Sequence, residues 1–364
     1  MFGRFFLPGP TEVHPDVLAA QARAMIGHRG AGMSTILGEA DPVLRRVFRT
    51  ERPVYVSSSS ATGFMEAGIR NGVRRRALSL VNGAFSERFR GLVADCGKEG
   101  ESYEVAWGEA HRPEEVERRL RAGGFDAVTV VHSETSTGVL NPLPEIAEAV
   151  REAERATGEE ILLLVDGVTS VGGNFVETDA WGLDWILTGS QKALALPPGL
   201  AFGSASDRML ARAATLTGRG QYFDLLEFDR YWKKHQTPNT PALTLIYALH
   251  AQLKRIDAEG VENRASRHVA MAERCRSWTE TTGARAGLSV FAPRDARSWT
   301  VTAIAVPPRL KGSEVTAKLK ERGFTIGAGY GKLKDATIRI GHMGDHTIDG
   351  LNRLLAELEE IVEG

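Results

Sequence analysis

The chain has 364 residues, 42% of them hydrophobic, and its 45 Lys and Arg nearly balance its 46 Asp and Glu. This length exceeds one average domain and predicts one large and one small domain. The charge balance argues against a basic field for nucleic acid and against an acidic tail. Cys96 and Cys275 lie far apart without a metal-binding motif, so neither a disulfide framework nor a zinc site is expected.

The N-terminus, MFGRFFLPGP, has no apolar core long enough for a signal peptide, and no apolar run approaches membrane-spanning length. We therefore expect a soluble protein in a reducing, cytoplasmic setting. Residues 1–14 read as an irregular arm, because prolines and a glycine break any helix. The phenylalanines of this arm are too apolar for a free tail, so we expect it to pack on another surface.

After a helix over 16–25, a loop GHRG and a helix over 33–48, a short strand over 53–57 runs into the hydroxyl-rich stretch SSSSATG and a further helix. A strand, a small polar turn and a helix N-terminus together form an anion cradle, because free backbone N–H groups and the helix dipole point at one place. By itself the serine run is also typical of ordinary helix capping.

The remaining strands of the large domain are expected near 78, 128, 162, 185 and 201, separated mostly by helical segments, and they indicate a doubly wound sheet. The strand over 161–165 is apolar throughout, as in a sheet covered on both faces, and Asp166 follows it. A carboxylate there lies at the C-terminal edge of a parallel sheet, where α/β proteins bind their ligands.

Lys192 follows the small polar turn TGSQ and precedes the apolar run ALALPPG. Burial disfavours the ammonium form, so such a lysine tends toward a low pKa and toward nucleophilic or Schiff-base chemistry. Pyridoxal phosphate needs a lysine for its aldehyde and an anion beside its ring nitrogen. Lys192 and Asp166 can supply both groups, although a single lysine is more often an ordinary surface residue.

The segments VDGVTSVGG and TGSQKALALPPG resemble the aspartate and lysine segments of the class V aminotransferases, closest to the alanine-glyoxylate, serine-pyruvate and phosphoserine group. The resemblance covers nearly the whole chain. It implies the fold-type I transferase architecture: a large, mainly parallel, doubly wound domain with a seven-stranded type of sheet over residues 15–264, and a smaller C-terminal α/β domain over 265–364.

The same resemblance implies a pyridoxal phosphate site with Lys192 and Asp166 as its catalytic residues. In it Phe85 stacks on the ring where relatives commonly have tryptophan, with an ordinary core phenylalanine as the alternative, and Thr135 lies near the phenolic oxygen. The phosphate cradle is Ser60, Ala61 and Thr62, with Gln191 also at the cofactor. Relatives usually have glycine at the position of Ala61.

In the family, the segment corresponding to QTPNTP reaches the cofactor phosphate of the neighbouring subunit through its hydroxyls, here those of Thr237 and Thr240. The N-terminal segment FLPGPTEVHPDV resembles one that crosses the partner toward the substrate. Both features imply an obligate homodimer with a shared site.

Arg339 matches the arginine of the family's RIG motif, which implies a bidentate contact with the substrate carboxylate. In relatives a pair at the position of His28 and Arg29 often lies near the substrate, where phosphoserine enzymes hold a phosphate, and a solvated loop would explain the pair equally well. Lys332 and Lys334 lie in a glycine-rich segment that resembles the phosphoserine branch, and an exposed hairpin would explain them equally well.

The resemblance thus implies a transaminase that moves the amino group of alanine or serine to glyoxylate or pyruvate. A phosphoserine aminotransferase acting with 2-oxoglutarate is the alternative. A class V lyase such as a cysteine desulfurase is less favoured, because it needs a mobile-loop cysteine, and a non-catalytic relic is opposed by the intact lysine and aspartate.

Overall fold

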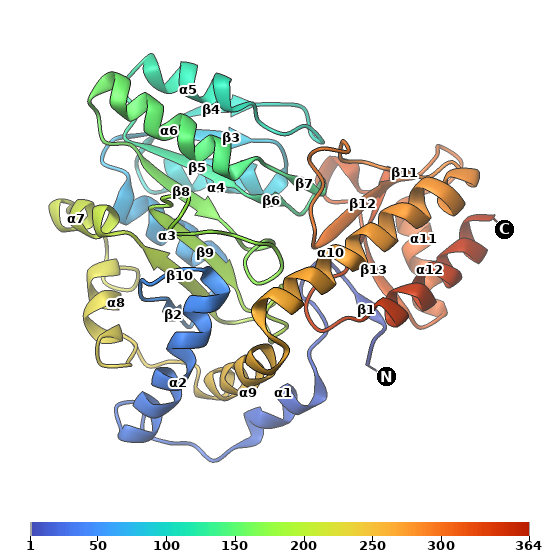
Figure 1. The fold of residues 1–364 in the computed structure, drawn as a ribbon, viewed down its shortest axis with the longest axis horizontal. Coiled ribbons are helices and arrows are strands. Elements are labelled where there is room, and N and C mark those ends of the chain that lie inside the picture. The colour runs from blue at the N-terminus through green and yellow to red at the C-terminus, as the bar shows by residue number, and fades with distance from the viewer. Residues whose placement is uncertain (1, 364) are drawn as a thin grey trace.

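The fold comes from a computed structural model that describes residues 2–363. In that range two large sheets lie side by side, one with seven strands and one with five (Figure 1). A third sheet has only the two strands β6 (Ser133–Glu134) and β7 (Val139–Leu140). The larger sheet runs in the order β2 (Tyr55–Ser57), β10 (Ala201–Ala205), β9 (Trp185–Gly189), β8 (Leu162–Asp166), β5 (Ala127–Val131), β3 (Arg76–Val81) and β4 (Glu99–Glu104).

Within the larger sheet, β4, β3, β5, β8 and β9 run parallel, and β10 is antiparallel to both of its neighbours. The strand ends are in register, with Val131 opposite Asp166 and Asp166 opposite Leu187. Every residue of β8 is buried, as expected for a sheet with helices on both faces. The expected mainly parallel, doubly wound sheet is therefore confirmed.

Helices α5 (Pro113–Arg121) and α6 (Leu143–Thr157) cover one face of this sheet, and α3 (Ala61–Gly72) and α4 (Ala84–Asp95) cover the other (Figure 1). The remaining α-helices are α1 (Pro15–Ala19), α2 (Ala31–Phe48), α7 (Asp207–Thr215), α8 (Leu225–Trp232), α9 (Leu243–Glu259), α10 (Val261–Trp278), α11 (Gly312–Glu321) and α12 (Ile348–Glu363).

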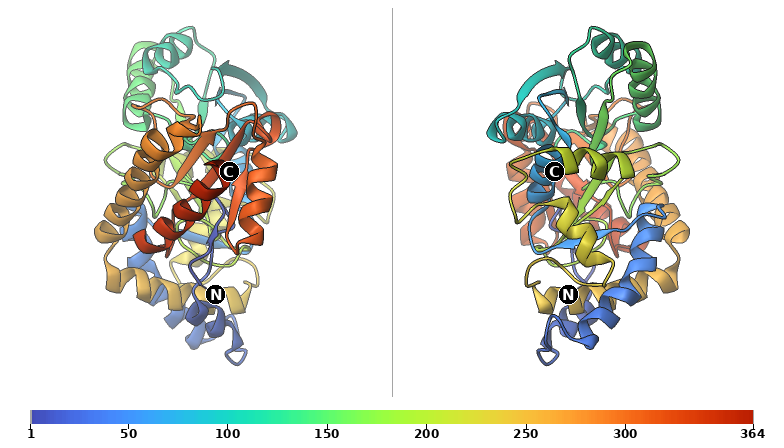
Figure 2. Two further views of the ribbon diagram at one scale, coloured as in Figure 1. Left: turned by 90° about the vertical axis from the view of Figure 1, so that its right-hand side faces the viewer. Right: turned by 90° about the vertical axis from the view of Figure 1, so that its left-hand side faces the viewer.

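The smaller sheet has the order β1 (Phe5–Phe6), β13 (Thr325–Ala328), β14 (Thr337–Gly341), β12 (Val301–Ala305) and β11 (Ser289–Val290). Its apolar core is separate from that of the larger sheet. Helix α10 spans both, because Val261 packs on the first core and Met271 lies in the second. The C-terminal elements lie on one side of the larger sheet, opposite α7 and α8 (Figure 2). The boundary between residues 264 and 265 stays a prediction.

Three expectations differ from the structure. The N-terminal arm is not wholly irregular, because Phe5–Phe6 forms β1, parallel to β13, and Phe6 enters the smaller core. The helix expected over 16–25 ends at Ala19, and only a 3₁₀ turn follows it. Strand β4 was not expected, because its sequence EGESYE is polar and only Tyr103 is buried, as on an edge strand. Among the described residues, no helix combines the length and the apolar character needed to cross a bilayer.

Candidate active site

The carboxyl ends of β2, β3, β5, β8 and β9 meet at one edge of the larger sheet, and the segments that follow them enclose a cavity of about 180 Å³. Eight of the residues singled out in the sequence line this cavity. They are Ser60, Ala61, Thr62, Phe85, Thr135, Asp166, Gln191 and Lys192. The fold thus gathers residues from five segments of the chain around one small space.

Lys192 is only 6% exposed, and its ammonium group donates a hydrogen bond to the backbone carbonyl of Pro8. Burial lowers the pKa of Lys192 to about 8, and the guanidinium of Arg339 acts in the same direction. The carboxylate of Asp166 opposes this shift without cancelling it. A substantial fraction of Lys192 is therefore a neutral, nucleophilic amine just above neutral pH.

Asp166 is the last residue of β8 and is 3% exposed. Burial raises the pKa of its carboxyl group to about 7, although the backbone N–H of Val168 donates a hydrogen bond to Oδ1 at 2.7 Å and opposes that shift. A cationic group against this carboxylate would favour its ionised form. Asp166 is therefore suited to hold a protonated ring nitrogen.

Glu134 sets the position of Phe85. Its buried carboxylate accepts hydrogen bonds from the backbone N–H groups of Phe85 at 3.3 Å, Ser86 at 3.0 Å and Ser136 at 3.1 Å. These contacts hold the first turn of α4 against the turn after β5. As a result, the ring of Phe85 lies over the cavity, with its centroid 5.8 Å from Nζ of Lys192.

Thr135 meets a residue that was not singled out in the sequence. Its hydroxyl lies 2.5 Å from the hydroxyl of Thr169, whose backbone carbonyl accepts a hydrogen bond from the hydroxyl of Thr300 at 2.6 Å. Thr169 also lines the cavity. These contacts fix the polar wall beside Lys192 to the segment that leads into β12.

The N-terminus of α3 opens on the same cavity. Ser60 is its N-cap residue in an extended conformation, but its side chain makes no capping hydrogen bond to the twelve-residue helix. The first N–H groups and the positive end of the helix dipole are thus available to an anion. With the anion cradle, the buried carboxylate and the buried amine on one cavity, the residues present fit pyridoxal phosphate.

Arg339 lies in β14 and points toward the site rather than to solvent. Its Nε donates to the carbonyl of Ala328 at 2.9 Å, and Nη1 donates to the carbonyl of Thr135 at 3.2 Å. Burial lowers the pKa of its guanidinium, as expected for a cation that has lost water without gaining a carboxylate. Within residues 2–363, Nη2 makes no hydrogen bond and can receive a substrate carboxylate.

Other residues named from the sequence lie outside the cavity of this single chain. Arg29 donates to the backbone carbonyls of Thr237 and Pro238. The hydroxyl of Thr237 donates to the carbonyl of Asn239 at 2.7 Å. The residues that do not line the cavity are His28, Arg29, Thr237, Thr240, Lys332, Lys334 and also Arg339, which contacts the wall residue Thr135. Their expected roles stay predictions.

Lys332 and Tyr330 illustrate what the sequence alone did not resolve. The ammonium of Lys332 lies 4.1 Å from the ring centroid of Trp107, and Lys334 is exposed. The ring of Tyr330 lies between Phe85, at 5.3 Å, and the guanidinium of Arg339, at 5.5 Å. Arg88 also lines the cavity, although it was not singled out in the sequence. Its position one helical turn after Phe85 was the signal that could have indicated it, because residues three apart lie on the same face of a helix.

Comparison with known proteins gives a consistent result. Residues 102–341 match the family described as aminotransferase class-V. An uncharacterized aminotransferase of Methanocaldococcus jannaschii is 38% identical, over 97% of this chain and 90% of that protein. The serine–glyoxylate aminotransferase of Methylorubrum extorquens is 32% identical, over 93% of this chain and 86% of that protein.

The crystal structure of an alanine–glyoxylate aminotransferase from Nostoc sp. superposes with a TM-score of 0.90 at 31% identity, covering 98% of this chain and 95% of that one. A phosphoserine aminotransferase from Bacillus circulans subsp. alkalophilus has a TM-score of 0.76 at 16% identity, which is a likeness of fold alone. The chain belongs to the class V aminotransferase family and is a fold-type I transaminase that uses pyridoxal phosphate.

Proposed function

We propose that this transaminase moves the amino group of a small L-amino acid, alanine or serine, to glyoxylate or pyruvate. The observation that carries the proposal is that Lys192 and Asp166 line one buried cavity, and that Arg339 donates a hydrogen bond to the carbonyl of Thr135 in the wall of that cavity. The names of two relatives support the substrate pair, because one is a serine–glyoxylate and the other an alanine–glyoxylate aminotransferase.

Pyridoxal phosphate, when bound, supplies an aldehyde for the amino group and a protonated ring that withdraws electrons. With the cofactor bound, Lys192 would hold its aldehyde, and as a neutral amine it would take the proton from the donor Cα. Asp166 would keep the ring nitrogen protonated, Phe85 would pack against the ring, and Thr135 would offer its hydroxyl to the phenolic oxygen.

The phosphate-binding role falls to the N-terminus of α3, where we place Ser60, Ala61 and Thr62, with Gln191 from the segment after β9. Backbone N–H groups at a helix start hold an anion without a long, mobile cationic side chain. The position of the cofactor relative to Lys192 is therefore set by the backbone of two neighbouring segments.

Arg339 would bind the substrate carboxylate and so align the Cα–H bond for removal by Lys192. Tyr330 lies beside that guanidinium and against Phe85, which limits the space beyond the carboxylate. This arrangement favours donors with short side chains.

The two alternatives have weaker support. A substrate phosphate would need a cluster of cations, yet Lys332 lies on Trp107 and Arg29 is bound to backbone carbonyls of its own chain. A lyase would need a reactive thiol, yet Cys275 is buried in α10 and burial raises its pKa to about 12.

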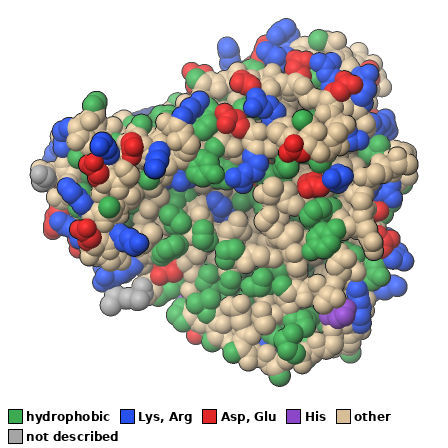
Figure 3. Space-filling model, turned by 180° about the vertical axis from the view of Figure 1, so that it is seen from behind, with side chains coloured by type: hydrophobic (Ala, Val, Ile, Leu, Met, Phe, Trp, Pro, Cys, Tyr) green, Lys and Arg blue, Asp and Glu red, His purple; other side chains and the backbone are tan. Residues whose placement is uncertain are grey.

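We also propose a homodimer with a shared site, in which Thr237 and Thr240 of each copy reach the cofactor phosphate of the other. Seen from behind, the protein carries a broad area where hydrophobic side chains gather and charged ones are few (Figure 3). Such an area is a candidate for burial against a second copy. The two free cysteines fit a cytoplasmic setting.

The test is a half-reaction. Cofactor-loaded enzyme is mixed separately with L-alanine, L-serine, L-aspartate and L-phosphoserine, and the cofactor absorbance is followed, with Lys192→Ala as the control. Rapid conversion by alanine or serine is the expected result. Conversion by phosphoserine alone, or by aspartate alone, would contradict the small-donor proposal.

A further inference from the structure

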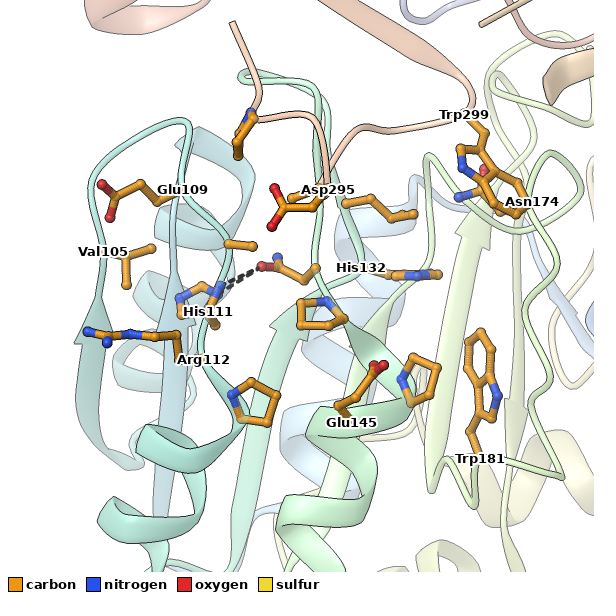
Figure 4. A pocket seen from close by; sticks show the side chains of 18 of the residues that line it. Val105, Glu109, His111, Arg112, His132, Glu145, Asn174, Trp181, Asp295 and Trp299 are labelled. Atoms are coloured by element: carbon orange, nitrogen blue, oxygen red, sulfur yellow. Dashed lines mark hydrogen bonds between the residues drawn. The ribbon is translucent and has the colours of Figure 1, made fainter. Parts of the chain in front are cut away.

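A second cavity lies behind the end of β5, on the other side from the cofactor site (Figure 4). Its volume is about 1110 Å³, against 180 Å³ for the cofactor cavity. Val131 and Ser133 line the cofactor cavity, whereas His132 lines this one, because side chains at the end of a strand alternate between faces. The two cavities therefore share a wall that is one strand thick.

Aromatic rings form much of the deep wall of the second cavity. The ring of His132 meets Trp181 edge-to-face with centroids 5.9 Å apart, and Phe175 meets Trp299 in the same way at 5.9 Å. Figure 4 shows Trp181 and Trp299 on the same side of the cavity, with His132 between them and the centre. The faces and edges of these rings remain in part accessible, since both tryptophans are only half-buried.

Buried polar atoms in this wall lack partners. Asn174 is 6% exposed, and within residues 2–363 neither its amide nitrogen nor its amide oxygen makes a hydrogen bond. Nδ1 of His132 is likewise unpaired. Native proteins leave few buried polar groups unsatisfied, because each such group costs stability. Their occurrence together in the wall of one cavity indicates a place that a ligand with hydrogen-bonding groups completes.

The charged side chains at the rim of the cavity indicate which kind of ligand it can bind. Four carboxylates line the cavity and one guanidinium, that of Arg112, accompanies them. In the described part of the chain, none of these carboxylates has a basic group within ion-pair distance. They are Glu109, Glu114, Glu145 and Asp295. The two histidines that line the cavity add no charge near neutral pH, because burial lowers the pKa of each.

We propose that this cavity is a second ligand site, and that it takes a small organic cation with N–H donors, such as an amine or a guanidine. Tryptophan faces attract cations, the carboxylates of the rim attract them over a longer range, and the amide oxygen of Asn174 can accept an N–H. Phosphorylated ligands are disfavoured, because the same carboxylates repel them.

The segment around Trp299 connects this site to the cofactor cavity through hydrogen bonds. Its neighbour Ser298 has its hydroxyl 2.7 Å from that of Ser133, and Thr300 donates to the backbone carbonyl of Thr169. Ser133 and Thr169 both line the cofactor cavity. A ligand that repositions Trp299 therefore changes the affinity for pyridoxal phosphate.

The experiment is a calorimetric titration of the cofactor-loaded enzyme with methylguanidine and with benzamidine, cations that carry N–H donors but no primary amine that could react with the cofactor aldehyde, and with citrate as the anionic comparison. We expect saturable binding of one cation per chain and no binding of citrate. Trp181→Ala should weaken the binding about tenfold, and Glu145→Gln should weaken it by about threefold. The matched control is Glu148→Gln, one turn along α6, where the glutamate is exposed and paired with Arg155, and there the affinity should not change.

A thermal unfolding curve shows whether Trp181→Ala is folded. If it is not, Asp295→Asn replaces it as the test variant, because Asp295 is exposed and its substitution does not disturb the core. The absence of cation binding at millimolar concentration, an equal effect of Glu148→Gln, or preferential binding of citrate would each overturn the proposal. We also expect the cation to change the dissociation constant of pyridoxal phosphate by about fivefold or more. An unchanged constant would refute the coupling. None of these readouts uses amino transfer, so they are independent of the proposed donor.

Discussion

Gly9 offers a sharp test of the site, because the N-terminal arm contacts the amine of Lys192, the group that we propose to be catalytic. A methyl group at this position would lie 2.5 Å from Cε of Lys192, and 2.6 Å from both Cδ and Nζ. The backbone of Gly9 also has a φ of +114°, a conformation that residues with a side chain rarely adopt. We therefore expect Gly9→Ala to strain the arm and to displace the lysine at the same time.

The two effects differ in kind. The backbone strain should lower the free energy of unfolding by about 1–3 kcal/mol. The steric clash adds little to that, because the atoms it meets belong to the flexible end of a side chain. That flexible end carries the reacting nitrogen, and a displacement of roughly 1 Å costs about 100-fold in rate, or about 2.7 kcal/mol of activation free energy. The loss of rate should exceed what the loss of stability explains.

The assay is a single-turnover reaction of the loaded enzyme with L-alanine, followed by cofactor absorbance, together with a denaturant titration. Gly218→Ala is the matched control, since Gly218 has a φ of +79° and a side chain added there meets nothing within 4 Å. It should lose stability and keep its rate. An unchanged rate in Gly9→Ala, or an equal loss of rate in both variants, would refute the contact between arm and lysine as a determinant of the amine's position.

Three further predictions follow from the same site and from the smaller core. In the cofactor-free protein, the rate of pyridoxal phosphate uptake should rise with pH until about 8 and then level off, because only the neutral amine of Lys192 reacts; stopped-flow absorbance measures it, and a flat profile would contradict the lowered pKa. Arg339→Lys should lower kcat/KM for alanine by roughly 10- to 100-fold, mainly through KM, since the bidentate contact is lost; a change confined to kcat would argue against a carboxylate-binding role. Burial lowers the pKa of His342 to about 3. As the pH falls below about 6.5, the imidazole therefore takes up a proton in the unfolded chain but not in the folded one. This difference should lower the free energy of unfolding by up to about 1.4 kcal/mol per pH unit from about pH 6.5 toward pH 3. Urea titrations of the wild type and of His342→Gln at two pH values above and below 6.5 test this, and an equal pH dependence in both would speak against it.

Much of the larger sheet was predictable because its signals are local. The apolar run over 161–165 followed by Asp166 indicates a covered parallel strand with a polar residue at its end, and the structure has β8 in that place. Lys192 follows the next strand in the same way, after β9. Adjacent parallel strands bring such ends together, so the spacing alone was enough to expect the two side chains at one edge.

Elements that depend on a partner strand were harder to predict. The residues of β4 carry no apolar alternation, and they form a strand only because β3 offers its free edge to them. The same holds for β1, where Phe5 and Phe6 pair with β13, more than three hundred residues away in the chain. Local propensity contains no information about either pairing.

The sequence by itself determined the fold class and the positions of most strands, because each depends on a short local pattern. It also predicted roles for Lys192 and Asp166 from their positions after strands, and a role for Arg339 from the resemblance to the family. Tertiary structure alone decided that the carbonyl of Pro8 meets an amine 184 residues away, that Glu134 holds the start of α4, and that a second, acidic and aromatic cavity lies behind β5. Each of these contacts joins segments that only the completed sheet brings together, and their burial shifts the pKa values on which the chemistry depends.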